Sequence, residues 1–127
     1  MLAGCTTTNT ATTDGQLKVA TSFYPLYYFA SQIGGDYADV TNLTPAGTEP
    51  HDYELTPQNV AAIQDSQLLV LNGAQLEPWA EDVTADLPTS TTVVEIATGQ
   101  TDPHVWLSPT LAQTAVHTIT ASFIQAD

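Results

Sequence analysis

Positive charge is almost absent from this sequence. Lys18 is the single Lys or Arg residue against 14 Asp and Glu residues, which gives a formal net charge of −13. Contacts to nucleic-acid phosphates need Lys and Arg side chains, so this composition argues against nucleic-acid binding. It also argues against a basic patch for an anionic membrane surface. An acidic surface both keeps a protein soluble and attracts small cations, and charge alone does not choose between these two roles.

Cysteine and long apolar segments are scarce as well. The single cysteine, Cys5, excludes an internal disulfide and any zinc site built from several cysteines. The longest apolar runs are far shorter than the roughly 20 residues of a membrane-spanning helix. Hydrophobic residues still make up 43% of the 127 residues, which is enough for the core of one compact domain.

The first residues predict a lipid anchor. Leu2-Ala3-Gly4-Cys5 resembles the lipobox of bacterial lipoproteins, a signal in which the cysteine becomes the lipid-carrying N-terminus. We therefore predict lipidation at Cys5 and attachment to the membrane through this lipid. The Thr-rich stretch that follows contains no large apolar residue, so residues 1–16 are predicted to be a lipobox remnant and a flexible tether. A free cysteine in a disordered N-terminus is the alternative.

Strand-like and helix-like patterns alternate along the rest of the chain. Segments rich in β-branched or apolar residues predict four strands, at 18–22, 37–43, 68–71 and 92–96. N-capping residues, prolines and apolar residues at helical spacing predict four helices, at 25–33, 56–65, 78–87 and from 108 onward. The unbroken apolar run 68–71 is typical of a strand buried on both faces. This alternation predicts an α/β fold with a small parallel four-stranded sheet flanked by helices.

The last predicted helix sets the expected domain organisation. We expect residues 17–108 to form one lobe and residues 109–127 to begin a longer helix. Its apolar stripe still needs a partner surface where the sequence stops at Asp127, so we expect the chain to be cut inside this helix. The stripe consists of Leu111, Ala115, Ile119 and Phe123.

Two histidines lie where an open parallel sheet binds ligands, beyond the carboxyl ends of its strands. His51 follows the second predicted strand, and His104 follows the fourth. Neutral imidazole is a common ligand for zinc and other divalent ions. Ordinary surface or packing histidines would give the same pattern, and no local metal motif such as HExxH decides between these possibilities.

Acidic residues accompany the first histidine closely. Glu49, Asp52 and Glu54 surround His51 in the sequence TEPHDYE and are candidates to orient a ligating imidazole through hydrogen bonds. Simple surface charges are the alternative for these acids. His117 falls inside the last predicted helix, where we expect a solvated or packing residue.

Four ordered blocks carry a resemblance to a known family. They are 23–26 (FYPL), 50–55 (PHDYEL), 71–79 (LNGAQLEPW) and 102–109 (DPHVWLSP). From residue 23 to 109 the sequence resembles the N-terminal lobe of the zinc and manganese substrate-binding proteins of ABC importers. That family has two α/β lobes joined by one long helix, with the metal in the cleft between them. The resemblance implies that His51 and His104 are metal ligands and that Ser108, where the family often has aspartate, is a helix cap.

The resemblance also implies what this chain lacks and what it does. The second lobe, which supplies the remaining ligands in the family, is expected to be missing. The implied function is extracytoplasmic capture of a divalent metal for an ABC permease by a lipid-anchored or periplasmic protein, without catalysis. Zn²⁺ is favoured over Mn²⁺ because the block 76–79 (LEPW) resembles zinc-type members. The alternatives are a metal-dependent hydrolase using both histidines and Glu54, and an adhesin or interaction lobe.

Overall fold

Four parallel strands form the sheet at the centre of the protein. The structure is a computed structural model that describes residues 15–127, so the predicted lipidation site Cys5 and most of the tether lie outside the described residues. The strands are β1 (Leu17–Thr21), β2 (Ala38–Asn42), β3 (Leu68–Leu71) and β4 (Thr92–Glu95), arranged in the order β2-β1-β3-β4. All three pairings are parallel. The predicted four-stranded parallel sheet is thereby confirmed.

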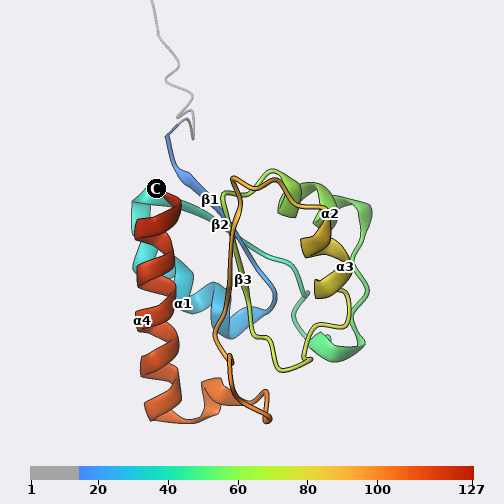
Figure 1. Cartoon of the computed structure of the whole chain (residues 1–127), viewed down its shortest axis with the longest axis vertical. Coiled ribbons are helices and arrows are strands. Elements are labelled where there is room, and N and C mark those ends of the chain that lie inside the picture. The colour runs from blue at the N-terminus through green and yellow to red at the C-terminus, as the bar shows by residue number, and fades with distance from the viewer. Residues whose placement is uncertain (1–14) are drawn as a thin grey trace, which may run out of the picture.

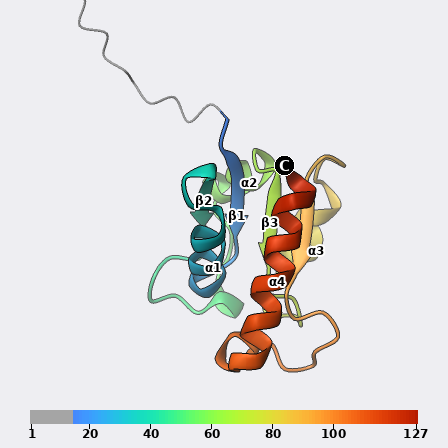
Figure 2. The ribbon, with the colours of Figure 1, turned by 90° about the vertical axis from the view of Figure 1, so that its left-hand side faces the viewer.

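Helices cover both faces of this sheet. They are α1 (Tyr24–Gly34), α2 (Pro57–Gln64), α3 (Ala80–Ala85) and α4 (Pro109–Ala126). Helices α1 and α4 lie on one face, and α2 and α3 lie on the other (Figure 1). The view turned by 90° shows α1 and α4 side by side in front of the sheet (Figure 2). Among residues 15–127, no helix combines the length and apolar character needed to cross a membrane.

Strand β3 shows how the sequence forms two cores at once. Its four residues are all buried, because side chains of a strand alternate between the two faces of the sheet. Leu68 and Val70 join the core under α1 and α4, whereas Leu69 and Leu71 join the core under α2 and α3. The run is therefore apolar throughout because both faces of this central parallel strand are buried, as expected.

Two helices begin as their sequences predict. Thr56 caps α2 in a complete capping box, in which its side chain accepts from the backbone N–H of Asn59 and the Asn59 side chain accepts from the backbone N–H of Thr56. The Ser108 hydroxyl accepts from the backbone N–H of Leu111 at the start of α4. Ser108 is thus the helix cap that the sequence predicts.

The third helix is shorter than its sequence predicts. The prediction of a helix over 78–87 was wrong in extent, since α3 covers only Ala80–Ala85. Trp79 occupies the N-cap position and offers no capping hydrogen bond, and Pro88 disfavours helical backbone at Leu87. Trp79, Val83 and Leu87 nevertheless pack together against the core beneath α2 and α3, so the predicted apolar face exists without a helix along its whole length.

Candidate metal site at the carboxyl end of the sheet

Two segments leave the sheet at the end where its parallel strands finish. The segment after β2 contains the 3-10 turn η2 (Pro50–Asp52), which includes His51. The segment after β4 leads to His104 and the 3-10 turn η3 (Val105–Leu107). Both segments lie at the same end of the sheet in Figure 1. This edge is where open α/β sheets bind ligands.

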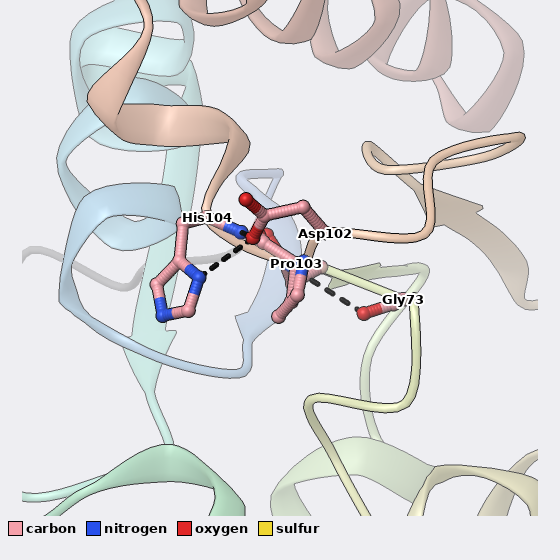
Figure 3. Close-up of polar contacts among 5 residues, drawn as sticks. Gly73, Asp102, Pro103 and His104 are labelled. Carbon is pink, nitrogen blue, oxygen red and sulfur yellow. Dashed lines mark hydrogen bonds and ion pairs between the residues drawn. The ribbon is translucent and has the colours of Figure 1, made fainter.

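His104 is held by a carboxylate on its own loop. Asp102 Oδ1 lies 2.7 Å from Nδ1 of His104 and also accepts the backbone N–H of His104 at 3.0 Å (Figure 3). The backbone hydrogen bond, followed by the bond to the ring, holds the pKa of Asp102 below its ordinary value. An ionised carboxylate can only accept, so the shared proton lies on Nδ1. In the neutral imidazole, the lone pair of Nε2 is then free to bind a metal ion.

An aromatic residue connects His104 to the core. The ring centroids of His104 and Trp106 lie 5.3 Å apart, and Trp106 meets the buried ring of Phe23 edge-on at 4.7 Å. Trp106 packs against the core beneath α1 and α4. The imidazole is exposed to solvent, yet its position is constrained by the Asp102 carboxylate and by this aromatic contact.

His51 has acidic neighbours that do not hold its ring. Glu49 Oε2 lies 3.9 Å from Nδ1, and Asp52 Oδ2 lies 3.5 Å from Nε2. Both distances are too long for good hydrogen bonds. Within the described part of the chain, Glu54 makes no ion pair with His51, although both residues line the same surface pocket. None of these three acids is therefore placed to orient the His51 ring as Asp102 orients the ring of His104.

Trp79 also lines this pocket. Trp79 Nε1 is buried beside the pocket and has no hydrogen-bond partner among residues 15–127. The rest of the Trp79 ring packs against the core under α2 and α3.

No complete metal cluster forms within the described residues. Over residues 15–127, no group of three or more His, Cys, Asp or Glu side chains is arranged to hold a metal ion. His51 and His104 each bring one imidazole to this edge, accompanied by their own acids. The third histidine, His117, lies exposed on α4 and lines a different surface hollow with Phe29 and Pro109.

The sequence patterns did not predict one buried acid near this edge of the sheet. Glu77 is 6% exposed, and its carboxylate accepts from Ser22 Oγ at 2.6 Å and from the backbone N–H groups of Asn72 and Gly73 at 2.6 and 3.1 Å. Burial raises the pKa of Glu77, although these hydrogen bonds act in the opposite direction. The available signal was a lone acid between Leu76 and Pro78, two residues after the turn at Ala74 and Gln75 that follows β3.

Comparison with known proteins gives consistent matches to metal-binding relatives. Residues 19–127 match the family ZnuA, described as zinc-uptake complex component A, periplasmic. The high-affinity zinc uptake system protein ZnuA of Bacillus subtilis is 36% identical over 88% of this chain and 43% of its own length. The metal-dependent lipoprotein YcdH of Bacillus subtilis superposes with a TM-score of 0.82 at 41% identity, covering 88% of this chain and 45% of that one.

A zinc-bound structure is similarly close. The Zn(II)-bound ZnuA-like domain of Streptococcus pneumoniae AdcA superposes with a TM-score of 0.81 at 36% identity, covering 88% of this chain and 45% of that one. This chain therefore spans less than half the length of each of these relatives. The match over residues 19–127 includes both histidine segments and the whole sheet except the first two residues of β1. The chain belongs to the ZnuA family of zinc-uptake components.

Proposed function

We propose that this chain is the N-terminal lobe of an extracytoplasmic receptor that binds a divalent transition metal for an ABC permease, with His51 and His104 as ligands. The observation that carries the proposal is the Asp102–His104 pair, which fixes the imidazole and leaves Nε2 free at the ligand-binding edge. Family membership and the zinc-uptake names of the relatives support the same role.

The proposed cargo is Zn²⁺, with Mn²⁺ as the alternative. Imidazole nitrogen suits zinc, whereas manganese prefers sites made mainly of oxygen. Two histidines would supply two of the four ligands that zinc usually takes in proteins. The other positions would be filled by groups that residues 15–127 do not bring to this edge.

The partner and the cellular location that we propose rest on the same family membership. The relatives include proteins described as a component of a zinc uptake system and as a metal-dependent lipoprotein. We therefore propose an ABC permease as the partner and, through lipidation of Cys5, attachment to the membrane outside the cytoplasm. The proposed role is binding and delivery of the metal, without catalysis.

A zinc titration followed by histidine side-chain NMR tests this proposal, because it detects weak binding and resolves each ring. We expect zinc to shift the Nε2 signals of His51 and His104 and to leave His117 unchanged. His51→Ala and His104→Ala should each weaken binding, whereas the control His117→Ala should not. Equal shifts of all three histidines, or no shift at millimolar zinc, would overturn the proposal for this chain.

A further inference from the structure

The carbonyl of Pro103, directly before His104, is held by a residue 31 positions earlier. Asn72 follows the last residue of β3 and is completely buried. Its side-chain Nδ2 donates to the carbonyl of Pro103 at 2.8 Å and to that of Gly73 at 3.1 Å. We propose that Asn72 is a positioning residue for His104, an inference that rests on the metal-binding role proposed above.

The backbone at His104 shows what the Pro103 carbonyl does. His104 has φ −78° and ψ 41°, and the N–H of Val105 donates to the carbonyl of Pro103 at 2.8 Å. This is an inverse γ-turn with His104 as its central residue. A carbonyl oxygen accepts two hydrogen bonds, and Asn72 supplies the second one here. Asn72 thus fixes the turn at His104. Figure 3 shows the imidazole projecting from this loop beside Asp102 and Pro103.

The same residue anchors the other end of the loop. The backbone carbonyl of Asn72 accepts the N–H of Ala97, two residues after the end of β4, at 2.8 Å. The loop between Ala97 and Pro103 is therefore closed at both ends on Asn72, the residue that follows the neighbouring strand β3. A loop closed in this way has little freedom left to lose when a metal binds, which favours affinity.

Asn72 is itself held in place. Its backbone N–H donates to Glu77 Oε1 at 2.6 Å, and Ser22 Oγ donates to the same oxygen. This carboxylate links the end of β1 to the turn after β3, so the amide that holds Pro103 is attached to the rigid centre of the sheet.

The amide also carries a cost that a purely structural residue would avoid. Asn72 Oδ1 is buried and has no hydrogen-bond partner among residues 15–127. A buried unpaired acceptor is destabilising, and each such group calls for an explanation. The explanation we infer is that only a side chain with two donors holds the carbonyls of Gly73 and Pro103 together.

The test compares Asn72→Ala and Asn72→Asp with Thr21→Val. Aspartate keeps the shape of the side chain but, when ionised, cannot donate to Pro103. Thr21 is equally buried at the end of β1, and its hydroxyl donates to the carbonyl of Thr41 at 2.9 Å. Thr21→Val therefore removes a partly buried hydrogen bond that has no link to His104. The measurements are zinc affinity from the His104 ring signal and ¹⁵N order parameters of residues 102–105.

We expect both Asn72 variants to bind zinc about tenfold more weakly, the lower end of what removing a group that orients a metal ligand costs. The order parameters of residues 102–105 should fall in metal-free protein. Thr21→Val should change neither quantity, even where it lowers stability. Parental affinity and parental order parameters in Asn72→Ala would overturn the inference, and so would an equal loss of zinc affinity in Thr21→Val.

The inference can still be tested if the Asn72 variants do not fold or if the parent binds no zinc. If the Asn72 variants do not fold, the exchange rate of the Asn72 side-chain amide protons in the parent protein decides, because free exchange with solvent would contradict a lasting bond to Pro103. If the parent binds no zinc, the proposed function fails. The rigidity of residues 102–105 then still shows whether Asn72 fixes the backbone at His104.

Discussion

Ser22 and Glu77 are 55 residues apart in the chain and are joined by a buried hydrogen bond of 2.6 Å. Ser22 follows β1, and Glu77 lies in the loop that follows β3. The bond therefore ties together the ends of two neighbouring central strands. Because Glu77 also accepts from the backbone of Asn72 and Gly73, one carboxylate organises the base of the candidate metal site.

Glu77→Gln should change how stability depends on pH. Burial raises the pKa of Glu77 above its ordinary value of 4.5, so the folded chain holds this proton more tightly than the unfolded chain does. The resulting stabilisation is complete below the unfolded pKa and is lost as the pH rises through the folded pKa. Urea unfolding from pH 4.5 to neutrality should show the parent losing stability relative to Glu77→Gln. The exposed Glu81→Gln serves as control, and a parent-to-variant difference that does not vary with pH would contradict the prediction.

Asp102→Ala should weaken zinc binding about tenfold to a hundredfold, because the His104 ring loses the carboxylate that orients it. Asp102→Asn should fall between this variant and the parent, since its amide oxygen still accepts but carries no charge. Asp65→Ala removes the same charge at an exposed pair with Lys18 and should leave zinc affinity unchanged. Calorimetric titration measures all three. Equal losses in Asp65→Ala and Asp102→Ala would indicate a general effect of net charge.

Gly34→Ala should destabilise the fold by about 1–3 kcal/mol through overpacking. A Cβ atom at Gly34 would overlap the Cβ of Ala38 and lie 2.9 Å from the Phe123 ring, where α1, β2 and α4 meet. The backbone at Gly34 is ordinary helix, so the effect is purely steric. Denaturant unfolding measures it, and Gly34→Ala combined with Ala38→Gly should recover part of the loss. No recovery in the double variant would refute the steric cause.

Thr56→Ala should destabilise the protein by about 1 kcal/mol, because the first turn of α2 loses its capping hydrogen bond. Thr56→Ser keeps the hydroxyl and should retain most of the stability. Thermal unfolding of the two variants checks the prediction. A serine variant as unstable as the alanine variant would show that the threonine methyl group, rather than the cap, matters at this position.

Local patterns in the sequence predicted most of the fold. The apolar run at 68–71 and the helix starts at Thr56-Pro57 and Ser108-Pro109 each act over a few residues, so their structural effect can be predicted without knowing their partners. The exception is α3, where apolar spacing predicted a longer helix. The spacing of apolar residues predicts which side chains share a face. The length of the helix depends instead on its ends, where Trp79 gives no cap and Pro88 disfavours helical backbone at Leu87.

The sequence by itself determined the parallel α/β sheet, the edge at which ligands would bind and the two histidines that follow its strands. Only the tertiary structure decided which acid holds a histidine: Asp102 pairs with His104, whereas the acids around His51 stay beyond hydrogen-bond distance. It also brought Asn72 to Pro103 and Glu77 to Ser22. These contacts join residues 31 and 55 positions apart, and their distances depend on strand order and loop geometry, which no local pattern encodes.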